Sequence, residues 1–202
     1  MAPRPVLQFK ITLQGIEPPV WRRIQISDLC NFWDLHVAIQ DSMGWLDCHL
    51  HQFEMNHSIA KGKEYLGIPD EDWSVGDIET LAGWEYQVRD YLVINKQFTY
   101  EYDFGDGWIH LIEYEGEQKK QPGEKYPLCL DGKRACPPED VGGIPGYEEF
   151  VEAIKNPKHP EHEEFLQWVG GKFNPNIFDA KKIKFDSPKK RWDQSFKNNT
   201  AL

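Results

Sequence analysis

The sequence predicts a single α+β domain in which an antiparallel β-sheet of hairpins packs against a few α-helices. Short segments in which apolar and polar residues alternate indicate half-buried strands, and Gly and Pro residues separate these segments. The chain has 202 residues, of which 40% are hydrophobic and 13% aromatic, so it can bury a substantial core. We expect the domain to cover residues 1–180 and a basic C-terminal extension to cover residues 181–202.

The N-terminal segment is expected to form a hairpin with a wide loop. Apolar residues alternate with polar ones over residues 7–13, and the pattern resumes over residues 20–26. Gly15 and Pro18-Pro19 interrupt the pattern, because glycine and proline rarely continue a strand. Two antiparallel strands follow from this pattern.

A helix and a third strand are predicted next. Asn31 is a suitable N-cap for a helix over residues 32–43, and Gly44 is a suitable stop after it. Residues 45–55 are then predicted to form a strand, in which side chains two residues apart share a face. The residues expected on one such face are His49, His51, Phe53 and Met55.

The middle and the C-terminal part of the chain carry weaker signals. Residues 69–73 are predicted to be a loop and residues 84–88 a strand, whereas residues 89–94 suit either a short helix or a strand. Two helices are expected from about residue 147 to 155 and from about residue 160 to 169, since Pro or Gly follows each of them.

The most informative segment, residues 98–114, is a predicted hairpin rich in aromatic and acidic side chains. A two-residue turn at Asp106-Gly107 would place His110 opposite Asp103, and a turn one residue earlier would place it opposite Glu101. His110 faces a carboxylate in both alternatives. The aromatic residues expected to share one side are Phe98, Tyr100, Tyr102 and Phe104.

A metal site is one hypothesis for the histidines and aspartates of these strands. Imidazole and carboxylate ligands suit zinc, iron or manganese, and water bound to such an ion would support hydrolysis. The candidate ligands are His49, His51, Asp103, Asp106 and His110. In the alternative, the histidines hydrogen-bond to carboxylates or carbonyls and the aspartates cap the turn. The first two histidines lie two residues apart, which would let both point at one ion, but this spacing is weaker evidence for a metal site than a helical His-Glu-x-x-His motif, and we favour the alternative.

Residues 136–147 are expected to be rigid and irregular, because prolines fix φ and glycines allow positive φ. This segment would serve as an acidic binding loop or as a connector that positions the following helix. The binding-loop candidates, which include a tryptophan from the hairpin, are Cys136, Glu139, Asp140, Trp108 and Tyr147.

The cysteines do not indicate a reactive centre. Cys129 and Cys136 lack the spacing of a zinc ribbon. They could approach each other across a turn at Asp131-Gly132 as a redox pair or as two soft ligands, but we expect both to be reduced thiols. Cys48 and His49 are neighbours on a predicted strand, so they would point to opposite faces and would not form a nucleophile and base pair.

The charge of the chain is unevenly distributed. The net charge is −10, but residues 181–202 contain seven basic and two acidic residues, so the preceding part carries −15. An acidic body repels a phosphate backbone, and we expect nucleic acid to contact only the basic extension, if any part. The sequence has no run of ~20 apolar residues and no signal-peptide pattern at its start. We therefore expect a cytoplasmic protein that does not contact a membrane.

Four sequence blocks resemble the plasmid pRiA4b ORF-3-like family. They are Pro19-Val-Trp-Arg-Arg23, Met43-Gly-Trp45 with His49-Leu-His51-Gln-Phe53, Tyr100-Glu-Tyr-Asp-Phe-Gly-Asp-Gly-Trp108 with His110, and Ala135-Cys-Pro-Pro-Glu-Asp-Val-Gly-Gly143 with Gly146-Tyr147. In order and spacing the resemblance covers roughly residues 5–180. It implies an association with mobile elements, and some members of the family bear a resolvase-like name, but it implies no established activity.

A recombinase is not indicated, because only six arginines occur and no serine has a recognisable nucleophile setting. We expect a non-catalytic binding or interaction module associated with mobile-element or nucleic-acid-related partners. The alternative is a metal-dependent, nuclease-like hydrolase that uses the histidine and aspartate candidates. Convergence of those five side chains would favour the hydrolase, and their dispersal into separate hydrogen bonds would favour the module.

Overall fold

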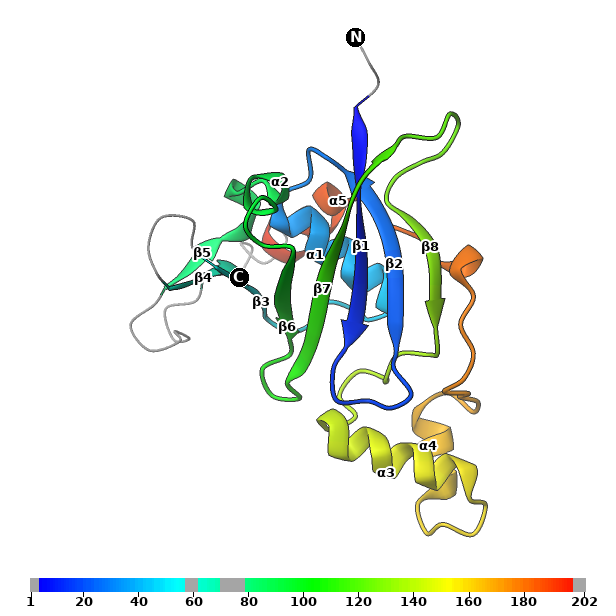
Figure 1. Ribbon diagram of the computed structural model, residues 1–202. Helices are drawn as coiled ribbons and strands as arrows, with labels where there is room; N and C mark the ends of the chain where they lie inside the picture. The colour runs from blue at the N-terminus through cyan, green and yellow to red at the C-terminus, as the bar shows by residue number, and fades with distance from the viewer. Residues whose placement is uncertain (1–3, 57–61, 70–78, 198–202) are drawn as a thin grey trace.

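The computed structural model describes residues 4–56, 62–69 and 79–197 (Figure 1). In these ranges the chain forms one sheet of eight strands in the order β5-β4-β3-β6-β7-β1-β2-β8, antiparallel except between β4 and β5. The strands are β1 (Pro5–Leu13), β2 (Trp21–Ser27), β3 (His51–Asn56), β4 (Lys63–Gly67), β5 (Thr80–Ala82), β6 (Gln97–Tyr102), β7 (Trp108–Lys119) and β8 (Leu128–Lys133). Helix α1 (Phe32–Met43) covers one face of this sheet, which confirms the predicted α+β class.

The predicted N-terminal hairpin is confirmed. Strand β1 pairs with β2 in antiparallel register, and alternate side chains of β1 enter the core. The inward residues, each at most 1% exposed, are Leu7, Phe9, Ile11 and Leu13. Strand β2 also pairs with β8, which the sequence pattern did not predict. The Asp131-Gly132 pair in β8 is typical of a turn, and pairing with β2 overrides that local preference.

Helix α1 begins and ends where the sequence predicts. Oδ1 of Asn31 accepts a hydrogen bond from the amide of Asp34 at 2.8 Å, and the Asp34 carboxylate accepts one from the amide of Asn31 at 3.1 Å. These reciprocal bonds form a capping box. Gly44 ends the helix with a φ of 94°, a conformation that favours glycine. The helix is buried on most sides, and His36 and Gln40 lie in the core beside its apolar residues.

Residues 45–50 do not form the strand that the sequence predicts. Strand β3 begins only at His51, and the chain before it turns at Asp47, whose φ is 60°. The carboxylate of Asp47 lies 2.7 Å from Nε2 of the buried His36, and this contact stabilises the turn. His49 therefore lies in a loop and does not share a strand face with His51.

The prediction of a strand at residues 84–88 is also wrong. A 3-10 helix, η1 (Gly83–Glu85), and a short helix, α2 (Val88–Tyr91), occupy this part of the chain. The helical alternative for residues 89–94 therefore holds for the beginning of that segment. In the predicted loop at 69–73, the residues from 70 onward lie outside the described ranges.

The β6–β7 hairpin has a wider connection than either predicted turn. His110 pairs with Tyr100, so residues 103–107 form the loop, and the prediction that His110 faces a carboxylate is wrong. Asp103 explains the wider loop, because its carbonyl accepts a hydrogen bond from the amide of Gly107 at 2.6 Å. Its carboxylate also accepts bonds from two other amides of the loop, which removes the need for a tight turn.

The remaining helices lie in two places. Helices α3 (Gly143–Lys155) and α4 (His162–Trp168) lie beyond one end of the sheet, and α3 begins earlier than predicted. The chain then passes β8 through η2 (Ala180–Lys182) and returns to α1 (Figure 1). There α5 (Pro188–Trp192) and η3 (Asp193–Lys197), which the sequence pattern did not predict, pack on α1. Of the helices in the described ranges, none has the length and apolar character needed to span a membrane.

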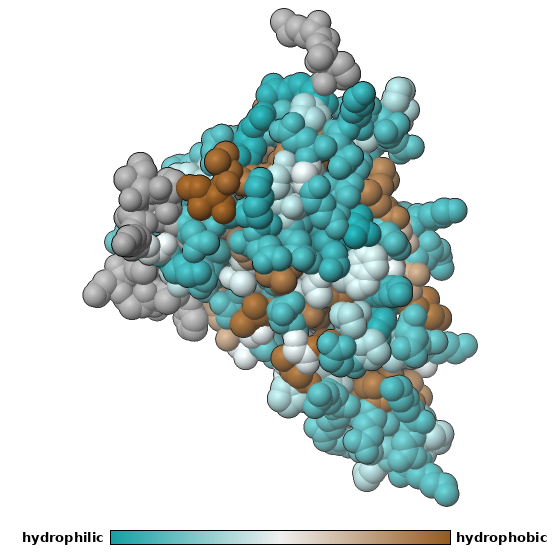
Figure 2. All heavy atoms as spheres, in the orientation of Figure 1, coloured by the Kyte–Doolittle hydropathy of each residue, from teal (hydrophilic) through white to brown (hydrophobic). Residues whose placement is uncertain are grey.

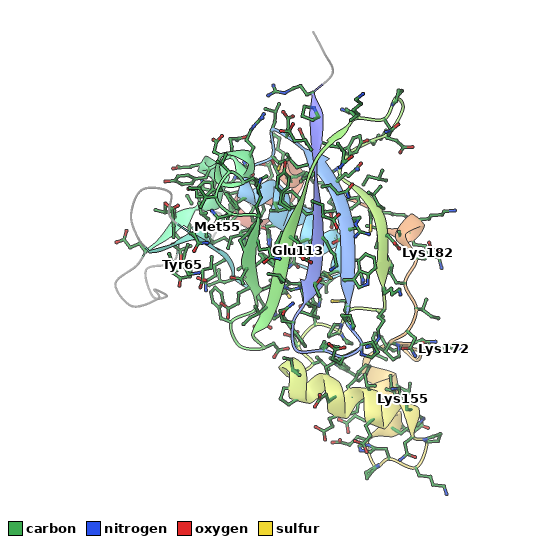
Figure 3. The ribbon with its side chains drawn as sticks, in the orientation of Figure 1. Met55, Tyr65, Glu113, Lys155, Lys172 and Lys182 are labelled. Carbon is green, nitrogen blue, oxygen red and sulfur yellow. The ribbon has the colours of Figure 1, made fainter. Side chains whose placement is uncertain are left out.

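The face of the sheet opposite α1 is open and mostly hydrophilic (Figure 2). Ion pairs between strands line it: Lys10 Nζ on β1 lies 3.0 Å from Glu113 on the adjacent β7, and Arg23 Nε on β2 reaches across β1 to lie 2.7 Å from Glu115 on β7. Figure 3 labels Glu113 near the middle of this face. The polar outward side chains suit contact with water, and the core lies on the other side of the sheet, beneath α1.

Candidate functional site

Three loops meet at the end of the sheet from which α3 begins (Figure 1). They are residues 45–50, between α1 and β3; residues 103–107, between β6 and β7; and residues 136–142, before α3. We call them together the three-loop platform. Most of the candidate side chains lie in this platform or directly below it, so the platform is the candidate functional site.

Hydrogen bonds join the first loop of the platform to the third. Nε1 of Trp45 donates to the carbonyl of Pro137 at 3.0 Å, and the amide of Leu46 donates to Oε1 of Glu139 at 2.6 Å. The hydroxyl of Tyr102 donates to the same carboxylate oxygen at 3.1 Å. Burial raises the pKa of Glu139, and these two donors oppose that rise. Glu139 therefore acts mainly as a structural acceptor between the two loops.

Close backbone packing joins the second loop to the third. Oδ2 of Asp106 accepts a hydrogen bond from the amide of Gly142 at 3.1 Å. At Gly143, where φ is +68°, an added Cβ would lie 2.6 Å from the carbonyl oxygen of Asp106. Only glycine allows this approach without displacement of one loop. The Gly142-Gly143 pair thus serves contact within the chain.

His49 lies at the centre of the platform. Its Nε2 is 2.8 Å from Oδ1 of Asp140 and 3.5 Å from Oδ2 of Asp103. One potential ligand atom from each of these three residues lies within 4.8 Å of the other two. The imidazole is 30% exposed, the Asp140 side chain 67% and the Asp103 side chain 10%, so the group is open to solvent on one side.

Cys48 lies beside this group. Its sulfur, His49 and Glu139 also offer ligand atoms within 4.8 Å of one another. Because residues 45–50 are not extended, the argument that Cys48 and His49 point to opposite faces is wrong. Partial burial and the charge of Glu139 nevertheless raise the pKa of the Cys48 thiol, so it is not an activated nucleophile at neutral pH.

The five ligand candidates from the sequence are dispersed. His49 and Asp103 come together and Asp106 lies nearby as a scaffold residue, but the other two histidines lie in the core. The ring of His51, 2% exposed, stacks on that of His36 with centroids 3.5 Å apart; burial and that neighbour hold its pKa well below the ordinary value. His110 is fully buried.

His110 is held by backbone carbonyls. Its Nδ1 lies 3.1 Å from the carbonyl of Trp108 and 3.3 Å from that of Tyr100. Burial lowers the pKa of His110 to about 4, so the ring is neutral at physiological pH and Nδ1 donates to these carbonyls. This role matches the simpler alternative from the sequence, in which a histidine hydrogen-bonds to carbonyls.

The binding-loop candidates also divide between platform and core. Glu139 and Asp140 belong to the platform, whereas Trp108 and Tyr147 are 1% and 3% exposed and fill the core. Cys136 is buried too, and burial raises its pKa to about 12. The four cysteines are free thiols. The acidic pair of this loop is therefore the part that a ligand can reach.

Sequence reasoning missed two arrangements. It placed His49 and Asp140 in separate candidate sets, although the structure joins them in one cluster, and no local pattern links residues 91 positions apart. It also missed a buried polar network, in which the Tyr100 hydroxyl lies 2.8 Å from Nδ1 of His36 and accepts a bond from Gln40 at 2.9 Å. The spacing of two polar residues four apart on the buried face of α1 was the available signal.

Comparisons with known proteins agree on fold and family. The family described as "Plasmid pRiA4b ORF-3-like protein" matches residues 5–182. The uncharacterized protein y4hQ of Sinorhizobium fredii is 39% identical over 166 residues, which are 82% of this chain and 81% of that protein. A crystal structure of a protein of unknown function, MM3350 from Methanosarcina mazei Go1, is similar with a TM-score of 0.82 and 37% identity, over 91% of this chain and 100% of that chain.

Proposed function

The chain belongs to the plasmid pRiA4b ORF-3-like family, and from this premise we propose that it is a non-catalytic binding module whose platform takes up a divalent cation. The observation that carries the proposal is the group formed by His49, Asp103 and Asp140, whose ligand atoms lie within 4.8 Å of one another. One imidazole and two carboxylates suit zinc, manganese or iron.

The construction of the platform supports a binding role. Each of its loops is tied to another by hydrogen bonds that do not involve His49, so the ligand group is supported by a fixed frame. Asp103 is held by amides of its own loop through Oδ1, which leaves Oδ2 directed toward His49. A preformed group loses little conformational entropy when a ligand binds.

Charge indicates the class of partner. The part of the chain before residue 181 carries −15, so direct binding of a phosphate backbone at the platform is unfavourable. A basic protein is attracted by the same charge. An association with mobile elements, which the family resemblance implies, would fit a basic, nucleic-acid-binding protein as the partner, with the cation bridging the platform and an acidic or polar group of that protein.

A metal-dependent hydrolase is the second candidate, and the solvent exposure of the ligand group favours it. Water bound to an ion at His49 would be accessible to a substrate. Against this candidate, His51 and His110, which were expected to complete the centre, are buried elsewhere and neutral. A hydrolase would also use a general base that is not a metal ligand. Among the described residues of the platform, no histidine other than His49 is present to serve as that base.

Elemental analysis of protein purified without chelator tests the cation. We expect one ion per chain in the wild type after incubation with zinc, manganese or iron, and none in the variant His49→Ala with retained circular dichroism. The control His159→Ala, in the connection between α3 and α4, should bind as the wild type does. A wild type that binds no ion contradicts the proposal.

A phosphoester assay separates the two candidates. The non-catalytic module predicts no turnover by the loaded wild type above that of His49→Ala. Turnover that depends on the ion and disappears in His49→Ala would replace the module with the hydrolase.

A further inference from the structure

A second surface, which shares Asp47 with the first loop of the platform, joins the C-terminal segment to α1. We call residues 186–197, which include α5 and η3, the strap. It lies on the side of the sheet that α1 covers (Figure 1). The strap fills a groove whose walls are two tryptophans and whose floor carries two aspartates, namely Trp33, Trp84, Asp41 and Asp47.

An arginine of the strap enters the acidic part of the groove. Nη2 of Arg191 lies 2.7 Å from Oδ1 of Asp41, and Nη1 lies 3.6 Å from Oδ2 of Asp47. The three side chains are only 13%, 7% and 6% exposed. Burial raises the pKa of Asp41, and the amide of Asp186 and the charge of Arg191 oppose that rise. Oδ1 of Asp47 is paired with His36, so Arg191 serves the Asp41 carboxylate and the other oxygen of Asp47. Without a cation these nearly buried oxygens would lack a partner, which is unfavourable.

The aromatic part of the groove holds two rings of the strap. The Trp192 ring lies edge-on to Trp33 and Trp84, with centroids 5.4 and 4.6 Å apart, and the Phe196 ring lies 5.7 Å from that of Trp33. Nε1 of Trp33 donates to the carbonyl of Pro188 at 3.0 Å. Aromatic anchors beside an arginine are typical of the energetic centres of protein interfaces.

The groove and its occupant differ in their relation to the family match. The groove residues lie within the part of the chain that matches the family, whereas that match ends at residue 182 and the strap follows it. The strap is also incompletely fitted, since an open cavity of about 240 Å³ remains beside it, lined in part by Trp33, Trp84 and Lys189. The occupant is basic, with three consecutive cations at 189–191, and the receptor is acidic. The complementary charges and the incomplete fit indicate that the strap occupies the groove as a ligand occupies a receptor, although both belong to the same chain.

We propose that this groove is a docking site for a basic, aromatic segment of a partner protein, and that the strap occupies it as an intramolecular competitor. The partner segment would carry the same pattern as the strap, an arginine followed at once by tryptophan and, four residues later, by phenylalanine. A tethered competitor acts at an effective concentration of about millimolar, so the wild type would respond only to a strong or abundant partner. This inference does not depend on the cation at the platform.

The test uses the full chain and a fluorescent peptide of residues 184–197. In the variant Arg191→Ala/Trp192→Ala the strap loses its anchors, and we expect the peptide to bind this variant at least tenfold more tightly than the wild type. The same peptide with Trp192→Ala and Phe196→Ala is the matched control and should not bind. Adding Asp41→Asn to the variant should abolish binding of the unaltered peptide.

Hydrogen exchange of the wild type supplies a test that needs no variant. We expect the strap amides to exchange by local opening, and therefore faster than the amides of β1 and β7. Excess peptide should compete for the groove and make the strap amides exchange faster still. Strap amides that exchange only with global unfolding would overturn the proposal. So would a folded double variant that fails to bind the peptide, or one that binds the altered peptide equally well.

Discussion

Nε2 of His49 lies 2.8 Å from Oδ1 of Asp140, although the two residues are 91 positions apart in the chain. The pair joins the loop after α1 to the loop before α3. Because the two side chains are 30% and 67% exposed, water screens their interaction and it contributes little to folding. The cation proposal rests on this pair together with Asp103.

Removal of one carboxylate from the ligand group should weaken cation binding. We expect Asp103→Asn to reduce the affinity for manganese or zinc roughly tenfold or more, because it removes a negative ligand while Oδ1 still accepts the loop amides. Isothermal titration calorimetry measures the change. The control Glu163→Gln removes the same charge on α4 and should leave the affinity unaltered; equal losses in both variants would indicate only a general effect of charge.

Because Gly143 packs closely on Asp106, any side chain at position 143 should lower the free energy of unfolding. Gly143→Ala places a Cβ 2.6 Å from a carbonyl oxygen at a φ of +68°, and we expect unfolding by urea to show a loss of about 2–3 kcal/mol. Gly170→Ala is the matched control, since φ is +84° there but nothing lies within 4 Å of the added Cβ. It should lose about 1 kcal/mol, from backbone strain alone. Equal losses would show that the contact with Asp106 is unimportant.

Two adjacent arginines of β2 should contribute very differently to stability. Arg22 is 1% exposed and donates to the carbonyls of Ser42 at 2.7 Å and Lys133 at 3.0 Å, so Arg22→Met leaves buried acceptors without donors. We expect it to lower the free energy of unfolding by about 3 kcal/mol. Arg23→Met breaks a solvent-exposed pair with Glu115 and should cost below about 1 kcal/mol. A reversal of this order in urea denaturation would contradict the assigned roles.

The buried histidines predict a loss of stability in mild acid. Burial lowers the pKa of His110 to about 4, whereas the ordinary value is 6.5, so the unfolded chain binds this proton first. Neutral His110 therefore contributes to the free energy of unfolding, on the order of 3 kcal/mol in total. This contribution is complete above pH 6.5 and is lost as the pH falls toward 4. Urea unfolding between pH 7 and 4 measures it. The slope should be smaller in His110→Gln, and an unchanged slope would assign the effect to other groups, such as His51.

Local signals in the sequence were sufficient for part of the fold. Helix α1 was predicted with its ends because Asn31 and Gly44 act on the backbone within a few residues of themselves. The β1–β2 hairpin was predicted because its alternation is regular and one face is buried. In contrast, β8 has a turn-like composition and forms a strand only because β2 offers a partner.

The candidate site was less accessible to prediction, because contacts between distant loops decide it. The turn at Asp47 depends on His36 in the core, and this contact removes His49 from the predicted strand. The wide loop after β6 depends on the Asp103 side chain, which satisfies amides that a tight turn would have left to the backbone. A period-two pattern contains no information on either contact.

The most direct test of the platform is the position of an anomalous scattering peak in crystals grown with manganese or zinc. The proposal predicts a single strong peak within about 2.0–2.3 Å of ligand atoms from His49, Asp103 and Asp140, with the His49–Asp140 hydrogen bond replaced by bonds to the ion. A platform without a peak, in crystals whose His49–Asp140 contact remains at hydrogen-bond distance, would contradict the claim that this group binds a cation.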